Sequence, residues 1–86
     1  MVTVEFYGIP RQRAGRADLN VPAGNVAELL AAIAQHCPAL ADLRRPDGRL
    51  AAHYLISLDG RCFINDPGSE LRPGDRVLLL SADAGG

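Results

Sequence analysis

Two segments near the start of the chain alternate between apolar and more polar positions. Residues 2–7 and residues 17–21 each place every second side chain on one face, which predicts two half-buried strands. The turn-rich stretch GIPRQRAGR lies between them, so we expect a hairpin with a long loop. The apolar positions are Val2, Val4, Phe6, Leu19 and Val21.

The next segment has helical spacing instead. Asn25 stands three residues before Glu28, the arrangement of a helix N-cap with a capping-box acid. Pro38 disfavours helical geometry at Cys37 and predicts the end of the helix there. The apolar positions that fall on one helical face are Val26, Leu29, Leu30, Ile33 and Cys37.

A short helical turn with Leu40 and Leu43, and then a turn at RPDGR, are expected in residues 39–52. HYLISLDGRCFI is typical of a β-hairpin, because Asp59-Gly60 suits a type I′ turn. On its first strand Tyr54, Ile56 and Leu58 share a face.

RVLLLSA follows the turn RPGD and is an almost unbroken apolar run, which is typical of a central strand. If Val77 and Leu79 face the helix, Leu78 and Leu80 lie on the opposite face. Exposed leucines there predict a partner-binding patch, and packing under Tyr7, arginine side chains or a loop is the alternative. The element order ββαβββ predicts an α+β fold with a mixed four- to five-stranded sheet packed on one main helix.

Composition narrows the function classes. The chain has 86 residues, 48% of them hydrophobic, and a formal charge of -1, so we expect one globular domain that does not bind nucleic acid. All 9 basic residues are arginine, which leaves no side-chain amine for a Schiff base or isopeptide bond. No apolar run is long enough to span a membrane, and no leader pattern is visible; we expect a cytoplasmic protein.

The sequence offers no clear catalytic or metal-binding set of side chains. Cys37 and Cys62 are expected to be packed free thiols, and His36 and His53 to be ordinary surface or partly buried histidines, because neither pair has metal-ligand spacing. The basic cluster of Arg11, Arg13 and Arg16 is expected to be a solvated loop, with an acidic patch on a partner as the alternative. Asp66 and Glu70 flank a turn, which disfavours general acid–base chemistry.

The chain ends in SADAGG. A terminal glycine pair is uncommon by chance, although a disordered end is the simplest interpretation. We expect a domain over 1–81 and a flexible tail over 82–86 that projects into water. The five residues beyond Ser81 could extend about 17 Å, enough to enter a cleft in another protein.

Four motifs together resemble the ubiquitin-like β-grasp sulfur carriers, which include the small subunit of molybdopterin synthase and the thiamine-pathway carrier. The resemblance covers essentially the whole chain. The motifs are FYGIPRQRAG, LDGR, LRPGDRVLLL and the terminal AGG.

The resemblance implies a β-grasp fold and a chemistry at the carboxylate of Gly86. A partner adenylating enzyme would use ATP to activate it, and a sulfur donor would convert it to a thiocarboxylate that a synthase or ligase subunit accepts. Gly85, Ala84 and Asp83 would thread through the partner's channel, and Leu78 and Leu80 would bind the partner. The chain itself would be a carrier without enzymatic activity, possessing no bound cofactor or metal, or the small subunit of a synthase.

Molybdopterin biosynthesis is the first expectation for the pathway, ahead of cysteine, thiamine, tRNA thiolation or a secondary-metabolite route. Many relatives have proline and a bulky apolar residue before the glycines, where this chain has Ser81, Ala82, Asp83 and Ala84. Because this segment would enter the partner's channel, the difference leaves the identity of the partner enzyme open. Two other functions remain open: a ubiquitin-like modifier conjugated through Gly86, and a β-grasp interaction module without terminal chemistry.

Overall fold

The protein is described by a computed structural model over residues 1–82, so the predicted tail-threading residues Asp83, Ala84 and Gly85 and the predicted reactive Gly86 lie outside the described residues. The elements in chain order are β1 (Val2–Phe6), α1 (Gly8–Ala14), β2 (Asp18–Val21), α2 (Val26–His36), the 3₁₀ helix η1 (Pro38–Leu43), β3 (Tyr54–Leu58), β4 (Cys62–Phe63) and β5 (Arg76–Ser81).

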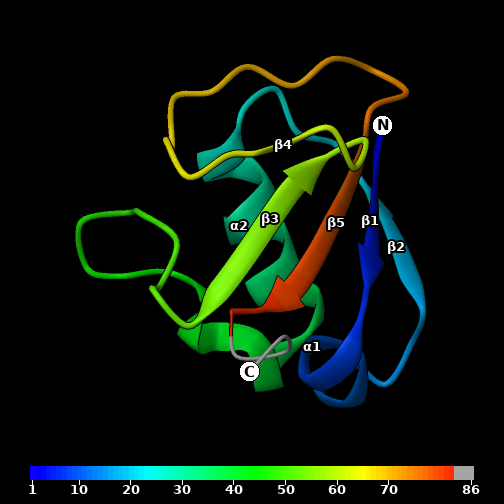
Figure 1. Cartoon of the computed structure of the whole chain (residues 1–86), viewed down its shortest axis with the longest axis vertical. Helices are drawn as coiled ribbons and strands as arrows, with labels where there is room; N and C mark the ends of the chain where they lie inside the picture. The colour runs from blue at the N-terminus through cyan, green and yellow to red at the C-terminus, as the bar shows by residue number, and fades with distance from the viewer. Residues whose placement is uncertain (83–86) are drawn as a thin grey trace.

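The strands form one mixed sheet in the order β2-β1-β5-β3-β4. β5 is parallel to β1 and antiparallel to β3, so the last strand lies in the middle beside the first. α2 crosses the back of the sheet in the view of Figure 1, while the front carries no helix. The predicted α+β arrangement, with a mixed sheet packed on one main helix, is confirmed.

The core lies between α2 and the sheet. Val26, Leu29, Leu30 and Ile33 of α2 are fully buried against the alternate apolar positions of the strands. Those strand positions are Val2, Val4, Phe6, Leu19, Val21, Tyr54, Ile56, Val77 and Leu79. In α2 and in the strands β1, β2 and β5, the periodicity that predicted the element therefore also predicted which of its faces is buried.

Asn25 caps α2 as predicted. Its Oδ1 accepts a hydrogen bond from the Glu28 amide at 2.8 Å. The Glu28 carboxylate accepts from the amide of Gly24 at 2.6 Å, one residue before the cap. The helix ends at His36, immediately before Cys37 and Pro38.

The segment GIPRQRAGR is a helix and a turn, so the prediction of an irregular loop was wrong. α1 tolerates Pro10 because the first turn of a helix leaves its amides without intrahelical partners. Gly15 ends the helix in the left-handed region at a φ of 70°, and its amide donates to the carbonyl of Arg11. A proline near the start and a glycine just past the end are the sequence signals of this helix.

The Asp59-Gly60 turn is confirmed, with φ values of 54° and 71°. The hairpin ends in β4, a two-residue edge strand whose side chains are exposed. The expectation that Cys62 is packed was therefore wrong, because β4 lies at the sheet edge, whereas Cys37 closes the apolar stripe of α2 and is buried. Burial raises the pKa of the Cys37 thiol.

Candidate functional site

The last strand carries the residues for which sequence analysis predicted a role. Val77 and Leu79 are fully buried toward α2, and Leu78 and Leu80 are half-buried on the other face. The predicted division of the four side chains between the faces is confirmed. A role for Leu78 and Leu80 in partner binding remains a prediction.

Strand pairing shows what surrounds these leucines. Residues paired across a sheet project on the same side. Leu80 is paired with Leu55, and Leu78 with Ser57, which is in turn paired with Phe63. We call Leu55, Phe63, Leu78 and Leu80 the open-face patch.

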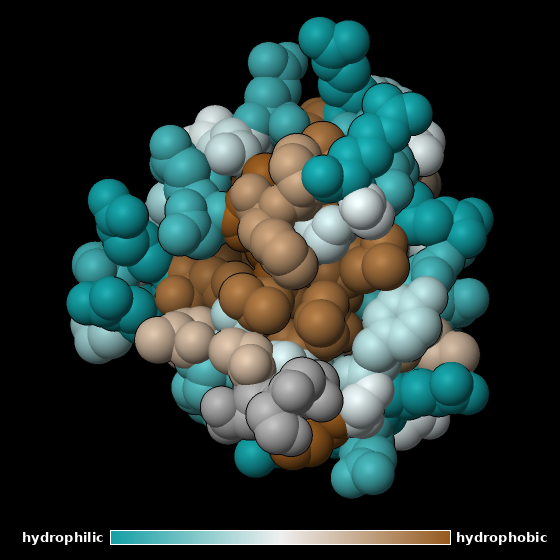
Figure 2. All heavy atoms as spheres, viewed as in Figure 1, coloured by the Kyte–Doolittle hydropathy of each residue, from teal (hydrophilic) through white to brown (hydrophobic). Residues whose placement is uncertain are grey.

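The open-face patch is an apolar area with polar side chains around it on this face of the molecule. Figure 2 shows apolar side chains gathered over the middle of the sheet with hydrophilic ones around them. Phe63, at the sheet edge, has 67% of its surface exposed. Contiguous apolar surface with a polar rim is typical of protein-binding sites.

Charged residues border the patch on the side of β1. Glu5 lies beside Leu78, forms an ion pair with Arg76 and accepts a hydrogen bond from the Tyr7 hydroxyl at 2.6 Å. The Tyr7 hydrogen bond and the Arg76 charge hold the pKa of Glu5 below its usual value, and the same hydrogen bond raises the pKa of Tyr7. The rim therefore presents an ionised carboxylate and a guanidinium at neutral pH.

A second group of polar side chains lies where β5 ends. The carboxylate of Asp42 accepts hydrogen bonds from Tyr54 Oη at 2.8 Å and Arg13 Nη1 at 3.0 Å, and His53 Nε2 lies 3.0 Å from it. Arg13 Nη1 also donates to Tyr54 Oη at 2.7 Å. Burial alone would raise the pKa of Asp42, but the three hydrogen bonds and the Arg13 charge together lower it. We call Arg13, Asp42, His53 and Tyr54 the Asp42 cluster.

Sequence reasoning missed the Asp42 cluster. Arg13 is 29 residues from Asp42 and 41 from Tyr54, so no local spacing connects them. The residues come from α1, η1 and the start of β3, and only the fold brings them together. The predicted solvated loop of arginines is in fact partly structural, since Arg13 belongs to this cluster.

The other candidate residues do not converge on a site. His36 is exposed, and Asp66 caps its own turn by accepting from the Gly68 amide at 2.9 Å. Within residues 1–82 no group of three His, Cys, Asp or Glu side chains could hold a metal ion, and no helix is both long and apolar enough to cross a membrane.

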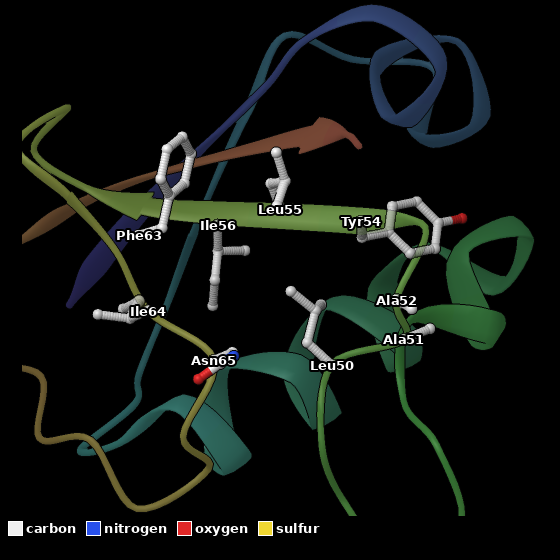
Figure 3. A pocket seen from close by; sticks show the side chains of 9 residues that line it. All are labelled: Leu50, Ala51, Ala52, Tyr54, Leu55, Ile56, Phe63, Ile64 and Asn65. Atoms are coloured by element: carbon white, nitrogen blue, oxygen red, sulfur yellow. The ribbon is translucent and has the colours of Figure 1, made fainter. Parts of the chain in front are cut away.

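A hollow of about 230 Å³ opens beside the open-face patch, at the edge of β3. In Figure 3, Leu55 and Phe63 point to one side of β3, and Ile56 points to the other, toward Leu50 and Ile64. The Tyr54 hydroxyl points away from the hollow toward the Asp42 cluster. Most of the lining residues are apolar, and they include no set of converging catalytic groups.

No family model and no curated protein matches this chain. Several solved structures do, over nearly their whole length. SAMP1 from Haloferax volcanii is 22% identical, with 99% of this chain and 98% of that chain covered and a TM-score of 0.82. A chain of the Amycolatopsis orientalis BexX/CysO complex is 19% identical, with both chains fully covered and a TM-score of 0.83.

A putative molybdopterin converting factor, subunit 1, from Pyrococcus furiosus is 24% identical, with 93% and 94% of the two chains covered and a TM-score of 0.70. The chain has the ubiquitin-like β-grasp fold. The β-grasp chain thus places its C-terminal strand at the centre of the sheet, with the open-face patch on one side and the Asp42 cluster at the strand's end.

Proposed function

We propose that this β-grasp protein is a sulfur carrier whose C-terminal glycine, Gly86, is adenylated by a partner enzyme and converted to a thiocarboxylate. The observation that carries the proposal is the position of β5. This strand is hydrogen-bonded on both sides, by β1 and β3, and Gly85-Gly86 follow it within five residues of sequence. A rigid domain of this kind can present a short acyl terminus to other proteins.

The chemistry requires activation because a carboxylate is a poor electrophile. The Gly86 carboxylate attacks the α-phosphate of ATP and releases pyrophosphate, which gives an acyl-adenylate. A sulfur donor supplied by the partner system then displaces AMP and leaves sulfur on the former carboxyl carbon. Glycine suits this step because it has no Cβ to widen the chain or to crowd the carbonyl.

The catalytic groups belong to the partners in this proposal, and the protein is a co-substrate. Residues 1–82 hold no converging nucleophile, base and oxyanion-binding group. The chain supplies the carbonyl of Gly86, a C-terminal segment long enough to enter a partner, and a surface for docking. The open-face patch is the docking surface that we propose for the adenylating enzyme and for the sulfur-accepting synthase or ligase.

Molybdopterin biosynthesis is the pathway that we place first. The similarity to a putative molybdopterin converting factor subunit supports it, and the cysteine and thiamine pathways are the alternatives. A second candidate function is protein modification through Gly86, which the similarity to two small archaeal modifier proteins favours. The absence of lysine excludes lysine-linked chains of the protein itself.

ATP–pyrophosphate exchange tests the proposal at its first step. The full chain is incubated with the activating enzyme encoded nearest to it, ATP and labelled pyrophosphate. We expect exchange with the wild-type chain and none after deletion of Gly86, while Gly68→Ala, a matched glycine variant in an internal turn, retains it. Exchange that survives deletion of Gly86 would overturn the proposal, and exchange with neither chain would favour an interaction module.

A further inference from the structure

The hydrogen-bond ladder between β3 and β5 continues one pair beyond β3. The amide of Ala82 donates to the backbone carbonyl of His53 at 2.9 Å, and at the other end the amide of Asp59 donates to Arg76 at 2.8 Å. In an antiparallel register these bonded pairs alternate, so the bonded pair next inward from Ala82 is Leu80 with Leu55. The His53 carbonyl therefore holds the last described residue of the chain.

His53 itself lies outside β3, so the sheet alone does not fix its carbonyl. Its ring is held by Asp42 at 3.0 Å, and the ring of the next residue, Tyr54, lies 4.3 Å from it between centroids. The Tyr54 hydroxyl donates to the same carboxylate. Both residues at the entrance to β3 are thus anchored by one acidic side chain.

Asp42 is itself well anchored. It lies in η1 between Leu40 and Leu43, which are both fully buried. Arg13 joins it from α1. In Figure 1, α1, the start of β3 and the end of β5 meet at the same end of the molecule.

We propose that Asp42 is a positioning residue for the C-terminal segment. The amide of Tyr54 donates to the carbonyl of Ala51 at 3.0 Å, which forms a turn around His53. Through the His53 ring, Asp42 adds a side-chain anchor to this turn, and the carbonyl of His53 in the turn accepts from the amide of Ala82. The hydrogen-bond ladder consequently reaches Ala82, one residue past the end of β5, with the support of the side-chain cluster. Without the cluster the bonded ladder would end at Leu80.

This placement matters for activation if the proposed function is right, since Ala82 is the last described residue before the proposed reactive terminus. Freeing Ala82 would add about 3.4 Å of reach. The gain in reach would come with a larger entropy cost when a partner orders the segment. The Asp42 cluster therefore shortens the reach of the C-terminal segment and lowers the entropy cost of ordering it on a partner.

Amide hydrogen exchange followed by NMR tests the inference on the isolated full chain. The variants are His53→Ala and Asp42→Ala, with His53→Gln as the conservative rescue, because its amide nitrogen can donate to Asp42 as the ring nitrogen does. Asp47→Ala, an exposed acid in the neighbouring turn that also faces an arginine, is the matched control. The reference is the amide of Tyr7, which donates to the carbonyl of Leu79 inside the sheet.

We expect exchange of the Ala82 amide to be faster by about fivefold in both alanine variants and to return to the wild-type rate in His53→Gln. The Tyr7 amide and all amides of Asp47→Ala outside its own turn should keep wild-type rates. An unchanged Ala82 rate in both alanine variants would overturn the inference, and so would an equal acceleration at Tyr7. The exchange measurement needs no partner and no sulfur chemistry. Failure of this inference can therefore be distinguished from failure of the proposed function, which pyrophosphate exchange tests.

Discussion

Leu55 and Leu80 face each other across β3 and β5, on the side of the sheet that α2 does not cover. Leu80 is the second-last residue of β5, and Leu55 is the second residue of β3. If a partner takes up the C-terminal segment as proposed, we expect it to contact this apolar pair as well. The proposal therefore predicts that the open-face patch contributes to binding of the partner.

Leu80→Glu should weaken binding to the activating enzyme while the domain stays folded. The side chain is half-buried on the open face, so the carboxylate can reach water but removes apolar contact area. Titration with the enzyme and far-UV circular dichroism give the two readouts. Gln35→Glu, which places the same charge on the exposed far side of α2, is the control, and loss of the fold in Leu80→Glu would show that the leucine belongs to the core.

The adjacent residues Leu78 and Leu79 of β5 should differ sharply in their contribution to stability. Leu79→Ala should lower the free energy of unfolding by about 2–5 kcal/mol because it leaves a cavity against α2. Leu78→Ala should cost about 1 kcal/mol, since its side chain is already half in water. Urea unfolding of the two variants measures the difference, and equal losses would contradict the assigned faces.

The contrast between the two leucines follows from alternation, and alternation is what made most of the fold predictable. The central strand β5, the capped amphipathic helix α2 and the Asp59-Gly60 turn each have a local signal. α1 was missed because its Pro10 and Gly15 were interpreted as turn residues, although their order matches a helix. Exposure of Cys62 depends on where the sheet ends, which no local pattern encodes.

The candidate site was predictable in unequal parts. The face of Leu78 and Leu80 follows from the burial of their neighbours in β5. The Asp42 cluster depends on three segments that meet only after folding, and a lone aspartate in a short helical turn gives no warning of it. Residues that interact through tertiary hydrogen bonds cannot be predicted from local sequence spacing.

Gly60→Ala should destabilise the hairpin. Gly60 adopts a φ of 71°, which costs a residue with a Cβ about 1 kcal/mol even though a Cβ built there would meet no neighbour within 4 Å. Gly68→Ala is the matched control, because Gly68 lies outside the positive-φ region and its Cβ would make an ordinary contact of 3.5 Å. Thermal unfolding should separate the two, and a similar loss in both would argue against the turn geometry.

The Asp42 cluster should weaken in acid. Because the folded state lowers the pKa of Asp42, its contribution to stability is fully present above the unfolded pKa and is lost as the pH falls through the lower, folded value. The difference in unfolding free energy between wild type and Asp42→Asn should therefore be constant near neutral pH and shrink below about pH 4. It should stay under about 1 kcal/mol, as for other exposed ion pairs. A difference that grows in acid would have the wrong sign for this account.

The high-resolution mass of the C-terminal peptide tests the sulfur-carrier proposal, after the full chain is purified from cells that contain its activating enzyme and sulfur source. We expect a fraction in which one oxygen of the Gly86 carboxyl group is replaced by sulfur, and none in the same peptide after Gly86 is deleted. The accurate mass separates this replacement from oxidation. A terminal peptide that keeps both oxygens in the presence of an active enzyme and sulfur source would contradict the proposal.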